Sequence, residues 1–83
     1  MEVSIGRITH YYDRIHVAVL NLSDELMVGD RVRIRGNATD FIQEVVSMEI
    51  EHQKVTSVGP DDEVALKVNE PARKGDTLYK IFE

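Results

Sequence analysis

The stretch VGDRVRI, at residues 28–34, contains the pattern on which the fold assignment rests. A Gly-Asp pair favours a turn, because glycine adopts a positive φ at little cost and an aspartate side chain can bond a backbone N–H two residues on. Polar and apolar residues then alternate, as they do in a β-strand with one buried face. KGDTLYKI, at 74–81, repeats the pattern, and PDDEVAL, at 60–66, is a looser version. The sequence thus predicts three turns that each lead into a strand.

Other runs with strand character occupy residues 14–22, 31–35, 41–50, 63–68 and 77–82. They are rich in β-branched and aromatic residues, and turn-forming residues separate them. The run 14–22 is apolar on both sides at its centre, which predicts a strand covered on both faces. Closure of a sheet removes its exposed edges, so about six short strands favour an all-β fold, a single closed six-stranded Greek-key β-barrel.

The chain is expected to form one domain over residues 1–83, since it has no room for a second core. A turn around residues 23–26, capped by Ser23, is the only helical candidate. The predicted core is apolar and lies on the inner faces of the strands. It consists of Val17, Val19, Val32, Ile34, Val46, Met48, Val64 and Leu66.

Composition narrows the class of protein. The chain has no cysteine, so disulfides and thiolate metal sites are excluded and the cytosol is compatible. No apolar run approaches the roughly 18 residues that span a membrane, and no signal pattern opens the chain. We therefore expect a soluble cytoplasmic protein. The net charge of −5 is unlike that of a dedicated nucleic-acid binder, which leaves only a local basic patch for such a role.

Taken in order, the motifs resemble a known family over roughly residues 3 to 82. The segments are IGRITHYYDRIHVAVLN, LMVGDRVRIRG, DFIQEVVSMEIEHQKVTSVGPDDEVALKV and ARKGDTLYKI. They resemble the second domain of translational GTPases such as elongation factor Tu, and more closely the small translation elongation factor-like proteins. A similar barrel ends some collagenase-like peptidases, a group associated with RNA modification. The chain departs from the pattern at Asp61 and Ala65, where glycine is common. It lacks a phosphate loop, so we expect no GTP binding.

An arginine stripe is the strongest candidate binding site. Arg31, Arg33 and Arg35 would point the same way about 6.5–7 Å apart, which approximates the phosphate spacing of a nucleic-acid strand. The resemblance implies contact with the tRNA acceptor end or ribosomal RNA. The alternative is a solvated outer face that protects an edge strand. Further residues expected to assist RNA binding are Arg7, Arg14, Tyr11 and Tyr12, with His10 as another stacking surface.

The tyrosine pair has an equally simple alternative, with one ring in the core and the other on the surface. The three histidines, His10, His16 and His52, are too scattered to predict a metal site. For His16, which falls in the apolar run, a structural hydrogen bond is the favoured interpretation. No catalytic constellation, metal site or cofactor site is predicted.

Two functional hypotheses follow. The first is a non-catalytic, RNA- or translation-associated binding module. The second is a protein-docking adaptor, working alone or beside a larger enzyme such as a collagenase-like peptidase. In that case an acidic face would meet a basic partner. That face would comprise Glu44, Glu49, Glu51, Asp61, Asp62 and Glu63.

Overall fold

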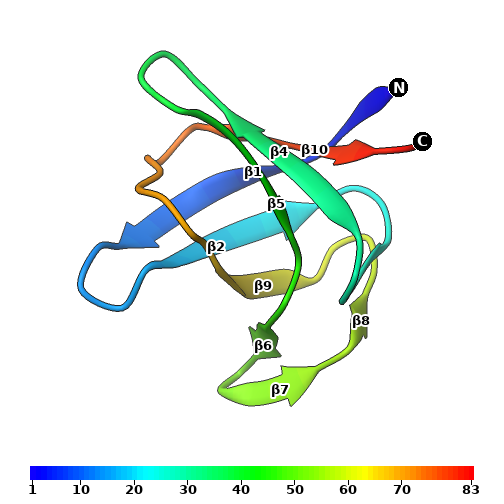
Figure 1. Ribbon diagram of the computed structural model, residues 1–83. Coiled ribbons are helices and arrows are strands. Elements are labelled where there is room, and N and C mark those ends of the chain that lie inside the picture. Colours follow the sequence, from blue (N-terminus) through cyan, green and yellow to red (C-terminus); the bar gives the residue numbers. More distant parts are fainter.

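The computed structural model describes residues 1–83 and consists of strands and their connections, with no helix (Figure 1). The all-β prediction is confirmed. The helical turn expected at 23–26 is absent, because these residues form a bend that leads into a short strand. No segment forms a helix long and apolar enough to cross a membrane. The strands are β1 (Glu2–Tyr12), β2 (Val17–Leu22), β3 (Leu26–Met27), β4 (Arg31–Arg35), β5 (Asp40–Glu44), β6 (Met48–Ile50), β7 (Gln53–Val55), β8 (Ser57–Val58), β9 (Glu63–Lys67) and β10 (Thr77–Ile81).

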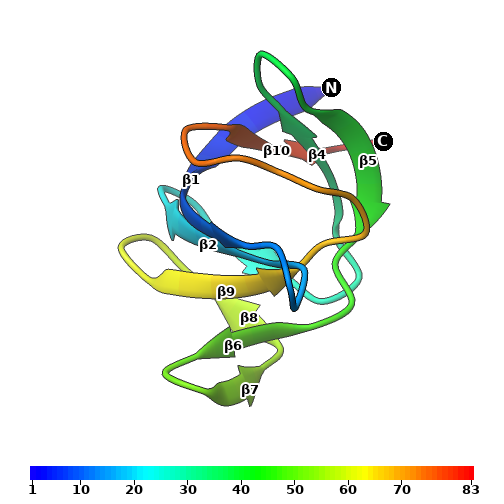
Figure 2. The ribbon, with the colours of Figure 1, turned by 90° about the vertical axis from the view of Figure 1, so that its left-hand side faces the viewer.

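Eight of these strands form one sheet in the order β5-β4-β10-β1-β2-β9-β6-β7, and β3 pairs with β8 separately. All the strand pairs are antiparallel. Figure 2 shows the sheet curling around one core, with β4 and β5 on one side and β9, β6 and β7 on the other. The predicted closed six-stranded barrel is wrong, because β5 and β7 are unpaired edges and no ladder joins them.

A side chain bridges part of the open seam beside β5. The amide of Gln43, a buried residue, donates to the carbonyl oxygen of Lys67 at 3.0 Å and accepts from the N–H of Asn69 at 2.7 Å. Gln43 thereby links β5 to the chain at the end of β9.

Strand β1 joins the two halves of the sheet. It pairs with β10 along its first part and with β2 along its second, and its register shifts between Ser4 and Gly6 and again between Ile8 and His10. Such bulges bend a strand and increase its twist, which lets one long strand follow the curl. The chain ends lie together, since Met1 and Phe82 exchange main-chain hydrogen bonds of 2.9 and 2.8 Å (Figure 1).

The three predicted turns are confirmed, and they share one hydrogen-bond arrangement. In each, an aspartate directly before a strand donates its N–H to the carbonyl oxygen three residues earlier. Its carboxylate accepts the N–H of that same earlier residue at 2.8 Å, rather than one two residues on as predicted, because it folds back over the turn. The pairs are Asp30 with Met27, Asp62 with Gly59 and Asp76 with Arg73.

The third residue of each turn has a positive φ, as in type II turns. Gly29 has a φ of 98° and Gly75 a φ of 94°, while Asp61 takes 69° in the version that lacks glycine. Asp61 therefore keeps the arrangement and accepts a conformation that costs side-chain-bearing residues energy. The turns lead into β4, β9 and β10 respectively.

The core was predicted correctly on three strands. Val32 and Ile34 on β4, Val64 and Leu66 on β9, and Met48 on β6 are all buried.

The predicted core was wrong on β2 and after β5. On β2 the buried residues are Ala18, Leu20 and Leu22, while Val17 and Val19 lie half-buried on the outer face. Because residues 14–22 are apolar on both sides at their centre, the sequence does not show which face of β2 turns towards the core. The run 41–50 is two strands, β5 and β6, and at the break Val45 is buried while Val46 is 58% exposed.

Candidate binding groove

The arginine stripe has the predicted orientation but is largely neutralised. Arg33 donates to both carboxylate oxygens of Asp40 at 2.7 and 2.8 Å and to Glu2 at 3.2 Å. These bonds raise the pKa of the Arg33 guanidinium, and the bonds from Arg33 lower the pKa of Asp40. Arg31 pairs with Glu83 at 3.3 Å. Two of the three arginines are thus engaged within the protein.

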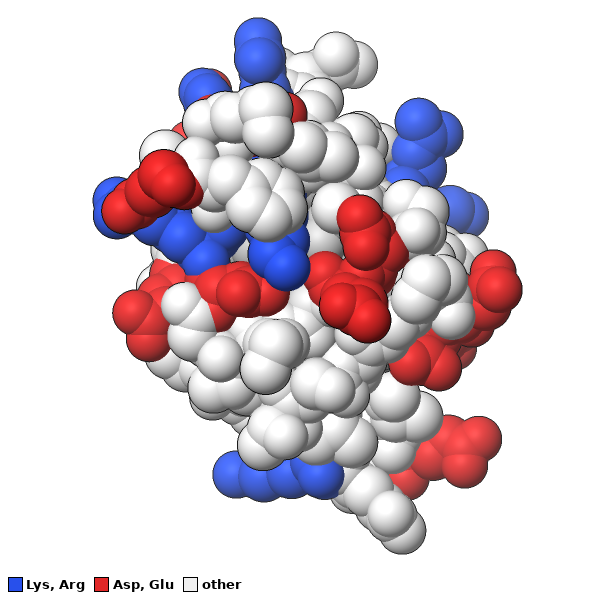
Figure 3. All heavy atoms as spheres, turned by 90° about the vertical axis from the view of Figure 1, so that its right-hand side faces the viewer, with Lys and Arg blue, Asp and Glu red and all other residues white.

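Arg7 and Arg35 form no ion pair. Both are exposed, and both lie directly opposite Thr77 of β10, from β1 and β4 respectively. Their Cβ atoms are therefore about two strand spacings, or 9–10 Å, apart. Arg14 lies elsewhere, in the turn between β1 and β2. On the face where both termini lie, Lys and Arg side chains are interspersed with Asp and Glu, and no unbroken basic surface forms (Figure 3).

The tyrosine pair divides between the two faces of β1. Tyr11 packs against the core, whereas Tyr12 is exposed and its ring centroid lies 4.2 Å from that of His10. The two predicted stacking rings therefore do not share a surface. His16 is exposed in the β1–β2 turn with a φ of 55°, not in a strand, and its ring nitrogen lies 3.5 Å from the Tyr11 hydroxyl.

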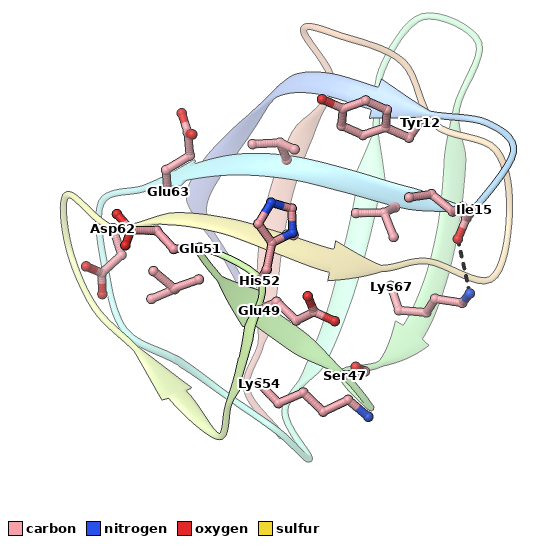
Figure 4. A pocket seen from close by; sticks show the side chains of 14 residues that line it. Tyr12, Ile15, Ser47, Glu49, Glu51, His52, Lys54, Asp62, Glu63 and Lys67 are labelled. Carbon is pink, nitrogen blue, oxygen red and sulfur yellow. Dashed lines mark hydrogen bonds between the residues drawn. The ribbon is translucent and has the colours of Figure 1, made fainter.

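A groove of about 1060 Å³ lies over the outer faces of β2, β9 and β6. Its apolar floor includes half-buried residues on two neighbouring strands: Val17 and Val19 on β2, and Ala65, which lies opposite Val19 on β9. Figure 4 shows His52 and Glu49 in the middle of the groove, with Glu51, Asp62 and Glu63 towards one end and Ile15 at the other. The remaining lining residues are Tyr12, Ser47, Ile50 and Lys54.

Four of the six residues of the predicted acidic face line this groove, namely Glu49, Glu51, Asp62 and Glu63. Glu44 and Asp61 do not. Sequence reasoning found the acidic residues but missed the groove, because its floor comes from Val17 and Val19, which were assigned to the core. The apolar residues on both sides of β2 were the signal for a second, outer apolar surface.

The turn between β6 and β7 carries Glu51 and His52 to the groove. Both have a positive φ, of 50° and 66°, and they connect Ile50 directly to its strand partner Gln53. Two-residue hairpin turns of this kind strongly favour Asn-Gly, because both central residues need a positive φ. Glu51 and His52, which both line the groove, are therefore not the residues that this turn conformation favours.

No group of three or more His, Cys, Asp or Glu side chains is placed to hold a metal ion. The groove carboxylates are spread around its lining, and one oxygen of Asp62 accepts the N–H of Gly59. Lys67 donates to the carbonyl oxygen of Ile15 at 3.1 Å. The arrangement suits recognition of a chain segment through an apolar floor and charged margins.

No protein-family model matches the chain. It is 35% identical over 83 residues to an uncharacterized protease of Methanocaldococcus jannaschii, and 31% identical over 82 residues to a collagenase of Porphyromonas gingivalis. These matches cover 99% and 96% of this chain but 20% of each relative. The chain thus spans about one fifth of the length of the curated relatives that it matches.

Solved structures show the same fold. The C-terminal domain of a protein described as a U32 peptidase, from Geobacillus thermoleovorans, has a TM-score of 0.87 at 20% identity. The match covers 94% of this chain and 91% of that domain. A selenomethionine variant of the same domain has a TM-score of 0.86. The collagenase-like part of the predicted resemblance is confirmed, while the elongation-factor part stays a prediction.

Proposed function

We propose that this chain is a non-catalytic docking domain that works beside a larger, collagenase-like peptidase and holds a protein segment in the groove over β2, β9 and β6. The groove is the observation that carries the proposal. It offers a half-buried apolar floor of Val17, Val19 and Ala65 on the sheet, with charged residues in and around it. Protein interfaces have this composition, with an apolar centre and a polar rim.

The comparisons support a role beside a larger protein. The M. jannaschii and P. gingivalis relatives are named as a protease and a collagenase, and each is about five times as long as the matched segment. The G. thermoleovorans structure contains only the C-terminal domain of its protein. A unit of this size beside a longer enzyme is well suited to position a substrate or a neighbouring domain.

RNA binding is the second candidate, and one observation favours it. Arg7 and Arg35 are exposed, unpaired and separated by Thr77 alone. The engagement of Arg33 with Asp40 and Glu2 removes the centre of the predicted stripe from this candidate. We therefore place docking first.

The docking proposal is tested by an amide chemical-shift titration of the labelled protein. The titrant is the M. jannaschii protease produced without its matching segment, and that segment alone serves as the reference binder. We expect saturable shifts at Val17, Val19 and Ala65. The proposal fails if the reference segment binds and this chain does not. It also fails if neither binds while bulk tRNA shifts Arg7 and Arg35, in which case RNA binding takes its place.

A further inference from the structure

Resting on the proposed docking function, we infer that the groove takes an extended protein segment in which a Lys or Arg lies two residues from an apolar residue, so that both side chains point to the same face of the segment. The apolar residues would cover the floor formed by Val17, Val19 and Ala65. The cationic side chain would reach the carboxylates beside it. The occupant is thus a cationic peptide segment.

The floor alone does not define the occupant, because apolar grooves accept many segments. Val19 and Ala65 are direct partners across β2 and β9, so they form a continuous surface two strands wide. Burial of apolar surface stabilises a complex by about 25 cal/mol per Å². A floor this narrow can cover only one or two side chains of an extended segment, since successive side chains of a strand point to opposite faces.

The charges of the groove select a cation. Glu49, Glu51 and Glu63 make no ion pair and no side-chain hydrogen bond within the protein, so their carboxylates are free to bind. The groove also holds Lys54 and Lys67, which keep their positive charge, but its four carboxylates outnumber these two lysines. The Lys67 ammonium donates to the carbonyl oxygen of Ile15. Lys54 lies opposite Glu49 on β7 without forming an ion pair with it. Like charges lining a concave surface reinforce one another's potential and attract the opposite charge.

The β6–β7 turn supplies an independent argument. Glu51 and His52 both adopt the left-handed conformation without being glycine, at φ values of 50° and 66°. Strained backbone of this kind persists where other requirements override local preference. Asn-Gly would suit the turn better, yet it would remove a carboxylate and an imidazole from the groove. The strain is accounted for if these two side chains contact the bound segment.

The test uses acetylated and amidated heptapeptides as probes. The first is Ser-Val-Thr-Val-Thr-Arg-Ser, in which both Val side chains and the Arg side chain point to one face of the extended peptide. The second replaces its Arg with Glu, and the third keeps Arg but replaces both Val residues with Ser. Binding to the labelled protein is followed through amide shifts of Val17, Val19 and Ala65. We expect the first peptide to bind in the groove, and the other two to bind at least about fivefold more weakly, as the loss of roughly 1 kcal/mol implies.

Variants of the protein locate the contact. Glu49→Gln and Glu63→Gln should each weaken binding of the Arg peptide about two- to fivefold, the range expected for partly exposed ion pairs. Glu70→Gln, at an exposed position outside the groove, is the matched control and should change nothing. The double variant Glu51→Asn/His52→Gly should raise the urea midpoint of unfolding and weaken peptide binding at the same time. A merely structural role for this turn would give the first effect without the second.

The two proposals fail separately. Equal binding of the Arg and Glu peptides in the groove would overturn the inference about charge and leave the docking function standing. A double variant that binds the Arg peptide as the parent protein does would also overturn it. If neither the peptides nor the truncated protease changes the amide chemical shifts of Val17, Val19 and Ala65, the proposed docking function is wrong as well.

Discussion

Gln43 accepts a hydrogen bond of 2.7 Å from the backbone N–H of Asn69, across the seam beside β5 that no strand ladder closes. The same side chain donates to Lys67. One amide group therefore satisfies two backbone groups beside the unpaired edge of β5. The position requires both a donor and an acceptor on one side chain, and the glutamine amide supplies both in neutral form.

Replacement of Gln43 by alanine should lower the free energy of unfolding by about 2–3 kcal/mol, because it leaves part-buried backbone groups without partners. Amide hydrogen exchange at Asn69 should become faster than in the parent protein. Gln53→Ala, at an exposed edge position of β7, is the control and should cost little. Equal effects of the two substitutions would show that the seam bonds contribute nothing specific.

The turn glycines give a second prediction. Gly29→Ala and Gly75→Ala should each destabilise the fold by about 1–2 kcal/mol, because a side-chain-bearing residue is strained at a positive φ. Gly59→Ala is a matched control, since its φ is not positive and an added Cβ would meet nothing within 4 Å. Urea unfolding of the three variants measures the difference. The assignment of these turns is wrong if Gly59→Ala costs as much as the other two.

A third prediction concerns acid. The pKa of Asp40 lies below its ordinary value, chiefly because Arg33 donates hydrogen bonds to its carboxylate. Such a carboxyl contributes stability above its unfolded-state pKa of about 3.9, and that contribution is lost as the pH falls through the lower folded-state pKa. Arg33→Gln should bring the Asp40 pKa back towards about 3.9 in a carboxyl-carbon NMR titration. Arg31→Gln should leave it unchanged, because Arg31 pairs with Glu83 instead.

A fourth prediction limits the RNA hypothesis. Arg7 and Arg35, on either side of Thr77, form no ion pair. If these two arginines alone bind tRNA, the binding should show a log-log salt slope of about −1.4, from about 0.7 for each of two phosphates. Arg7→Ser and Arg35→Ser should reduce it, whereas Arg14→Ser, in the distant turn, should not. A slope twice as steep would mean that Arg31 and Arg33 leave their carboxylates and join the contact.

The core supplies a fifth prediction. Val32→Asp should unfold the protein, since it buries a carboxyl group with no partner at a fully buried position. Val46→Asp should leave the fold intact, because this valine is 58% exposed. Circular dichroism and the thermal midpoint distinguish the two. A folded Val32→Asp protein would refute the assignment of the β4 core face.

Strand content was predictable wherever one face is clearly polar. On β4, arginines alternate with Val32 and Ile34, so the inner face was unambiguous. On β2, Val17 and Val19 alternate with Ala18 and Leu20. All four residues are apolar, so the alternation does not show which face of the strand is buried. The error there hid the groove, whose floor was taken for core. Closure of the sheet could not be predicted either. The alternation of polar and apolar residues does not show whether the free edge of β5 pairs with another strand or is linked to the chain after β9 through Gln43.

The candidate site was predictable in part. The acidic residues that line the groove were named together, because they are near one another in the sequence. The arginine stripe was oriented correctly, but the partners of Arg33 come from Glu2 and Asp40, which lie 31 and 7 residues away along the chain. The alternation of residues predicts the direction of a side chain, but it does not predict which residues the side chain contacts in the folded protein.

The hydrogen bonds between Met1 and Phe82 bring the two ends of the polypeptide to one corner of the sheet. A short linker could join these ends while a new opening is cut in a surface hairpin, giving a circularly permuted protein with the same ladders. By the same geometry, the unit could be spliced into a surface loop of a host protein without forcing that loop apart. Inserted in this way, the unit would make little demand on the architecture of its host.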